Sequence, residues 1–128
     1  MKAYTNVNLV TCDSAFHVYR EGLLVVEDDR IAYCGPYDEN WLGKCSETVD
    51  YEGAWIMPGL VNCHTHSAMA LLRGIRDDSN LHEWLEDYIW PAESQFTAEV
   101  TTKAVQFALA EMLLSGTTTF NDMYNPHG

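Results

Sequence analysis

The stretch 56-IMPGLVNCHTHSAMALLRG-74 contains two histidines, His64 and His66, one residue apart and directly after a short apolar run of strand type. Side chains alternate across a β-strand, so residues i and i+2 point to the same face, about 6.5 Å apart at Cα. Two imidazoles placed in this way can bind one metal ion. The alternative is two ordinary histidines near a loop, one packed and one solvated. The spacing alone does not decide between these interpretations, because His-x-His is a short motif.

The composition of the 128 residues indicates a folded protein with an acidic surface. The apolar fraction is 47% and the aromatic fraction is 12%, which is unlike a disordered chain. Nineteen acidic against seven basic residues, with a formal net charge of −12, argue against nucleic acid or an anionic membrane surface as a partner. The sequence shows no signal-peptide pattern and no apolar run of about 20 residues, so we expect a cytoplasmic protein without a membrane span.

The four cysteines are unevenly spaced and include no C-x-x-C pair: Cys12, Cys34, Cys45 and Cys63. This spacing argues against a zinc ribbon. Without an export signal, reduced and mostly buried thiols are predicted.

The first part of the chain, residues 1–57, has the pattern of short β-strands. The predicted strands cover residues 3–11, the two arms of a hairpin over 22–35, and 47–53. The hairpin turn is placed at Asp28-Asp29, and a loop or short helical turn is predicted over 36–46.

From Pro58 onward, strand and helix patterns alternate. A strand is predicted over 60–64, helices within 81–90 and 97–116, and a second strand over 117–123. Asn80 and Thr97 are predicted N-caps, Pro91 is predicted to end the first helix, and Gly116 is predicted to follow the second. The order strand, helix, helix, strand is typical of a βαβ unit with a parallel sheet.

The stretch around the two histidines resembles the opening barrel strand of the amidohydrolase superfamily of metal-dependent hydrolases. Pro58-Gly59, an apolar pair, a polar residue and the His-x-His pair all occur in register. Asn62 with 67-SAMALLRG-74 is similar to the mononuclear deaminase and chlorohydrolase branch. The stretch 82-HEWLEDYIWPAE-93 is similar to the 5′-methylthioadenosine/S-adenosylhomocysteine deaminases within it.

This resemblance covers essentially the whole chain and implies an α/β fold. Residues 58–128 would form the first βα units of a (β/α)8 barrel, and residues 1–57 would form strands of a small β-sandwich. A complete barrel needs about 250 residues. We therefore expect the barrel to be incomplete in this chain, as in an N-terminal fragment of a longer enzyme.

The resemblance also implies one divalent metal ion, zinc or iron, with His64 and His66 among its ligands. The implied reaction of the full-length parent is hydrolytic deamination of an adenosine-type nucleoside, 5′-methylthioadenosine or S-adenosylhomocysteine. The remaining ligands, a histidine and an aspartate, and a proton-shuttling glutamate would lie beyond residue 128, so the isolated chain is expected to be inactive. Glu93 matches the position that binds the ribose hydroxyls, and the alternative is a glutamate that stabilises a helix N-terminus or is simply solvated.

The remaining polar candidates are weaker. We expect His17 to be structural and His82 to be exposed. His127 is more typical of a mobile chain end than of a site residue. Asp122 is either a support for the metal site or a loop cap.

Two arginines and two tryptophans also have alternative roles. Arg73 and Arg76 could bind a substrate carboxylate, but pairing with the neighbouring acids at 77 and 78 is the more ordinary role. Trp84 and Trp90 fit core packing at helical spacing better than a platform for base stacking.

Two rival functions remain open. One is a different reaction on the same scaffold, either dechlorination of a triazine or deamination of guanine or cytosine. The other is a non-enzymatic β module that binds a metal through His-x-His.

The open edge of an unfinished sheet would also favour self-association, so a homo-oligomer is among the expected assemblies.

Overall fold

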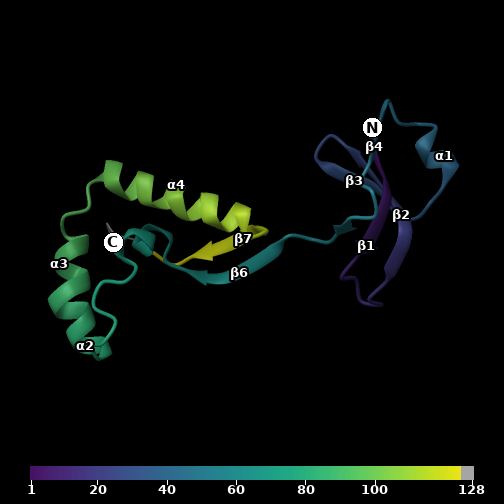
Figure 1. The fold of residues 1–128 in the computed structure, drawn as a ribbon. Coiled ribbons are helices and arrows are strands. Elements are labelled where there is room, and N and C mark those ends of the chain that lie inside the picture. Colours follow the sequence, from purple (N-terminus) through teal and green to yellow (C-terminus); the bar gives the residue numbers. More distant parts are fainter. Residues whose placement is uncertain (125–128) are drawn as a thin grey trace. The chain divides into compact units, whose positions relative to one another are not determined.

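The computed structural model describes residues 1–124, which form parts of two compact units, Met1–Pro58 and Gly59–Gly128. Figure 1 shows the first unit as a sheet of short strands and the second as two strands with helices. No helix in the described residues is long and apolar enough to cross a membrane.

The first unit is a five-stranded sheet with the order β3-β2-β1-β4, in which β5 also pairs with β1. Its elements are β1 (Lys2–Val10), β2 (Val18–Glu27), β3 (Arg30–Pro36), α1 (Glu39–Leu42), β4 (Glu47–Asp50) and β5 (Trp55–Ile56). The predicted strands, the hairpin turn at Asp28-Asp29 and the short helical turn are confirmed. The parallel pairing of β1 with β4 and β5 was not predicted, because it joins segments about 45 residues apart.

Both faces of this sheet carry buried apolar side chains. Ala3, Leu23 and Val25 form one fully buried cluster, and Val7 and Leu9 belong to a second. Successive residues of β2 contribute to different clusters because side chains alternate across a strand.

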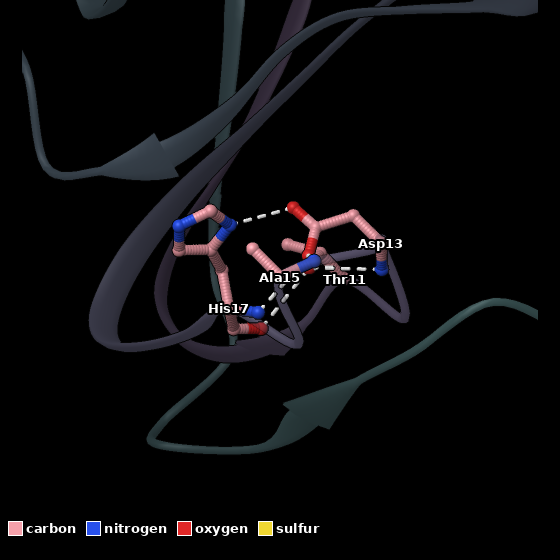
Figure 2. A network of polar contacts seen from close by, with 4 residues as sticks. All are labelled: Thr11, Asp13, Ala15 and His17. Carbon is pink, nitrogen blue, oxygen red and sulfur yellow. Dashed lines mark hydrogen bonds and ion pairs between the residues drawn. The ribbon is translucent and has the colours of Figure 1, made fainter.

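The loop between β1 and β2 is closed by a polar network around Asp13 (Figure 2). The Asp13 Oδ1 atom accepts hydrogen bonds from the amides of Ala15 (3.2 Å) and His17 (3.1 Å), and Oδ2 lies 2.6 Å from His17 Nδ1. The Thr11 hydroxyl donates to the His17 carbonyl at 3.1 Å. The hydrogen bonds from His17 lower the pKa of the Asp13 carboxyl to about 2. His17 thus stabilises this loop by its hydrogen bonds to Thr11 and Asp13, in agreement with its expected structural role.

The second unit is the predicted βαβ arrangement. Its strands β6 (Leu60–Thr65) and β7 (Thr117–Asp122) pair in parallel, and α4 (Ala98–Leu114) packs against β7 and against the 3₁₀ helix η1 (Ser67–Leu72), which follows β6 (Figure 1). Thr97 Oγ1 accepts a hydrogen bond from the Val100 amide at 3.2 Å, which confirms the predicted N-cap. Gly116 follows the helix with φ +84°, a conformation that glycine adopts without strain.

The helical segment that precedes α4 differs from the prediction. It runs through α2 (Leu81–Glu83), the π-helical η2 (Trp84–Ile89) and α3 (Trp90–Glu93), so Pro91 does not end the helix. In the wider π turn the Trp90 amide donates to the Leu85 carbonyl, five residues earlier. This change of register removes the fixed i−4 clash that a proline causes in an ordinary α-helix. The helix therefore continues as far as Glu93.

The burial of the cysteines also differs from the prediction. All four are free, but Cys12, Cys34 and Cys63 are exposed and Cys45 is only partly buried. Cys12 lies after β1 with φ +53°, and Cys63 lies on a strand of a two-stranded sheet. These locations provide little protein to cover the thiols.

Candidate active site

The two histidines lie together at the C-terminal end of β6. His64 is the penultimate residue of the strand, and His66 precedes the 3₁₀ helix η1 (Ser67–Leu72). Their ring centroids are 5.2 Å apart with an interplanar angle of 43°, and both residues are exposed. The Asn62 side-chain oxygen accepts a hydrogen bond from the His64 amide at 3.1 Å, which orders the backbone at this strand end.

The end of β7 is tied to the residue that follows His66. The Asp122 carboxylate accepts hydrogen bonds from the Ser67 amide (3.3 Å), from the Ser67 hydroxyl and from the Tyr124 amide (3.0 Å). Partial burial would raise the pKa of the Asp122 carboxyl, but the hydrogen bonds from Ser67 and Tyr124, together with His66, lower it overall. The loop-cap interpretation of Asp122 is therefore observed. A role of Asp122 in supporting a metal site remains a prediction. Such support would reach His66 through the backbone that joins it to Ser67.

A cavity of about 510 Å³ opens beside His66. Its walls are mainly apolar side chains from the helical segment, together with Met123, which follows β7. The ionisable groups in its lining are those of His66, Glu93 and Tyr124. The continuation of the helix through Pro91 places Glu93 at this cavity, because a helix that ended at Pro91 would leave Glu93 in a loop. The structure thus brings His66 and Glu93 together, and their proposed chemical roles remain predictions.

The two tryptophans have different environments. The Trp84 indole donates to the Ile75 carbonyl at 2.9 Å and is partly buried, as expected for a packing residue. Trp90 is 52% exposed and lines the cavity with Glu93, so the expectation that it packs in the core is wrong. The described residues cover this side chain incompletely.

Neither arginine pairs with the neighbouring acids in the described residues. Arg73 forms a two-pronged ion pair with Glu111 of α4, at 3.0 and 2.7 Å, and both residues line a second cavity of about 850 Å³ that also reaches His66. Arg76 donates to the Ser79 hydroxyl at 3.2 Å and lies over the Tyr88 ring. Packing of η1 against α4 brings Glu111 close to Arg73, and this tertiary contact cannot be read from adjacent positions in the sequence.

The other histidine predictions have separate outcomes. His82 is exposed and lies 3.3 Å from Glu86 one helical turn later, which confirms a surface position. His127 lies outside the described residues. Within residues 1–124, no group of three or more histidine, cysteine, aspartate or glutamate side chains is arranged to hold a metal ion.

Tyr124 was missed by sequence reasoning. Its hydroxyl is buried, and burial followed by the nearby Glu93 carboxylate raises the pKa of this phenol to about 12. Its ring lies edge-on to the His66 imidazole, with centroids 6.3 Å apart. A signal was present, because parallel strands end at the same edge of a sheet. A residue just after β7 should therefore approach one just after β6.

Comparison with known proteins identifies the family. The model of the Amidohydrolase family matches residues 55–128, which is more than half of the chain, so the chain belongs to this family. It is 44% identical over 127 residues to the 5-methylthioadenosine/S-adenosylhomocysteine deaminase of Bacillus cereus (strain 03BB102). It is 46% identical over 126 residues to the protein of that name from Bacillus cytotoxicus. Each match covers 98% of this chain and 29% of the relative, so the chain spans less than a third of the length of these relatives.

Two solved structures are also similar to this chain. A zinc-bound adenosine deaminase from Xanthomonas campestris matches with a TM-score of 0.82 and 33% identity, over 96% of this chain and 28% of that one. The zinc complex of atrazine chlorohydrolase from Arthrobacter aurescens TC1 matches with a TM-score of 0.82 over 97% and 29% of the two chains, but at 23% identity this similarity shows the fold alone. These matches confirm the predicted family and fold class. The chain has the fold of the first part of an amidohydrolase, with an incomplete barrel preceded by β-strands.

Proposed function

We propose that the full-length protein is a metal-dependent hydrolytic deaminase of adenosine-type nucleosides, with 5′-methylthioadenosine and S-adenosylhomocysteine as its substrates. Membership of the Amidohydrolase family and relatives at 44–46% identity that carry the name of this deaminase support the proposal. The observation that carries it is the adjacent pair His64 and His66, with ring centroids 5.2 Å apart at the end of β6.

The two histidines fit a divalent metal ion by their chemistry. Their rings are adjacent and exposed, and imidazole nitrogen is a good ligand for zinc and iron. A catalytic zinc ordinarily takes three protein ligands. Residues 1–124 contain no cluster of three such side chains, so we propose that the remaining ligands lie outside these residues. When bound, the ion would lower the pKa of its water to about 7 and so supply hydroxide at neutral pH.

Glu93 is the proposed contact for the ribose hydroxyls. It faces the same cavity as His66, and much of the cavity wall is apolar. An ionised carboxylate accepts hydrogen bonds but donates none, so it suits the two neighbouring O–H groups of a ribose. Trp90 adds an exposed aromatic surface beside it.

The proposal can be tested in the full-length protein by measuring bound metal and the release of ammonia. His64→Ala and His66→Ala should each reduce bound metal and activity. His82→Ala should change neither, because His82 is exposed and is paired with Glu86. Normal metal content in both His64→Ala and His66→Ala would contradict a metal site at the end of β6.

Substrate choice requires a panel of compounds. We expect turnover of 5′-methylthioadenosine and S-adenosylhomocysteine above that of guanine, cytosine or a chlorotriazine. Chloride release from the triazine, or preference for a free base, would favour one of the rival reactions. Tight one-to-one metal binding by the isolated, folded 128-residue chain would favour a non-enzymatic module, whereas we expect weak binding and no deamination.

The ribose contact can be tested separately with Glu93→Gln. This change should impair an adenosine-type nucleoside more than the corresponding free base, because only the nucleoside has the hydroxyl groups. Glu86→Gln is a matched control at an exposed position of η2. Equal losses for nucleoside and base would remove the ribose role of Glu93.

A further inference from the structure

The cavity beside His66 contains a polar group that the proposed function does not use, the hydroxyl of Tyr124. Its oxygen is buried and has no hydrogen-bond partner in the described part of the chain. The Glu93 carboxylate raises the pKa of the phenol by its charge and as a weak hydrogen-bond acceptor, but the two groups do not reach the distance and angle of a full hydrogen bond. A buried hydroxyl without a partner is unfavourable, and most such groups in native proteins are satisfied by protein, water or ligand.

The position of Tyr124 is determined by the strand ends. Its amide donates to Asp122 at 3.0 Å, and the preceding Met123 amide donates to the Thr65 carbonyl at 2.9 Å. These bonds link the residues after β7 to the end of β6. The hydroxyl is therefore held in the cavity wall by the backbone and does not depend on a side-chain partner of its own.

The chemistry of the lining indicates what this hydroxyl binds. Glu93 can accept the protons of two neighbouring hydroxyl groups, but a carboxylate cannot donate to their oxygens. A phenol can donate, and at neutral pH it is protonated even at the ordinary tyrosine pKa of 10.0, which burial and then Glu93 raise further. The two side chains together offer both the acceptor and the donor that a vicinal diol needs.

We propose that Tyr124 is a second hydroxyl-binding residue of this cavity, whose phenol donates to an oxygen of the ligand hydroxyls that give their protons to Glu93. The inference rests on the proposed role of Glu93. It adds a donor from the end of β7 and makes Tyr124 a determinant of the preference for ribonucleosides over nucleosides that lack these hydroxyls.

The test uses Tyr124→Phe in the metal-loaded, full-length protein, because phenylalanine retains the aromatic ring beside His66. With a ribonucleoside substrate we expect KM to rise about tenfold, the scale of one lost hydrogen bond in a buried site, with kcat nearly unchanged. With the 2′,3′-dideoxy analogue KM should be the same as in the unmodified protein. Equal effects on both compounds, or no effect on the ribonucleoside, would overturn the proposal.

Glu93→Gln in the same assay separates the two inferences. If Glu93→Gln loses the preference for the ribonucleoside and Tyr124→Phe does not, the role of Tyr124 fails and that of Glu93 stands. If neither change alters the preference, both roles fail.

A second measurement tests the proposal even if the Tyr124→Phe variant does not fold. We would place 3-fluorotyrosine at position 124 and record its ¹⁹F resonance during titration with each compound. The ribonucleoside should shift this resonance and the dideoxy analogue should not. Identical shifts would contradict a hydrogen bond to the ligand hydroxyls.

Discussion

Gly59, the residue before β6, is predicted to be essential for the pairing of the two strands that carry the site. A Cβ atom at this position would lie 2.6 Å from the Thr118 Cβ and closer still to the other Thr118 side-chain atoms. Because the Thr118 Cβ is attached directly to the backbone, no rotamer of Thr118 removes the overlap. Gly59→Ala must therefore push β6 and β7 apart. We expect a loss of about 1–3 kcal/mol, the usual range for an overpacked site.

The effect can be measured locally by hydrogen exchange and mass spectrometry of the full-length protein. A loss of this size corresponds to exchange that is roughly 5- to 150-fold faster in peptides that contain β6 and β7. Gly43→Ala is the matched control, because Gly43 has φ −62° and its nearest contact for a new methyl group is the Glu39 carbonyl at 3.4 Å. Adding Thr118→Gly to Gly59→Ala should restore slow exchange, and Thr118→Ala should restore less because it retains Cβ. Unchanged exchange in Gly59→Ala would refute the close approach of the strands.

Three further changes test other parts of the structure. Asp122→Ala removes the acceptor for the buried Ser67 hydroxyl, so we expect about 1–3 kcal/mol of lost local stability and reduced metal content. Asp122→Asn keeps an acceptor and should lose less. Equal losses in the two variants would contradict this role of Asp122. The His17 amide should titrate in ¹⁵N-histidine NMR with a midpoint near 2, because the Asp13 pKa is lowered from 3.8 to about 2, and Asp13→Asn should abolish this titration. The stabilising contribution of this pair is therefore fully present above pH 3.8 and lost as the pH falls through 2, so a midpoint near 3.8 would show that the pair does not form. Thr97→Ala should destabilise the first turn of α4 by about 1 kcal/mol, seen as faster amide exchange, and Thr97→Ser should not.

The architecture explains how a small parallel sheet can assemble a site from distant segments. β6 and β7 run in the same direction, so their C-terminal ends bring His66 and Tyr124 to one edge. The Asp122 carboxylate joins these ends by its hydrogen bond to Ser67, and the helical segment between the strands places Glu93 in the lining of the same cavity. The three ionisable residues of the cavity, His66, Glu93 and Tyr124, come from three different parts of the chain, which makes the cavity sensitive to the strand pairing tested by Gly59→Ala.

Much of the secondary structure was predictable because its signals are local. The hairpin turn at Asp28-Asp29, the Thr97 cap and the helix end before Gly116 depend on nearby residues, and all three are confirmed. Pro91 misled the prediction because a proline rule for ordinary α-helices does not apply to the wider π turn at Trp84–Ile89. The burial of the cysteines was mispredicted for another reason, since exposure depends on what covers a residue and not on its type.

The sequence by itself determined the order of strands and helices, the side-by-side placement of His64 and His66 and the family of the protein. These features follow from backbone periodicity and from a contiguous motif, which neighbouring residues specify. Only the tertiary structure decided that Arg73 pairs with Glu111 and that Tyr124 and Glu93 share a cavity with His66. Such contacts join residues far apart along the chain, and they form only when the parallel strands and the intervening helices pack together.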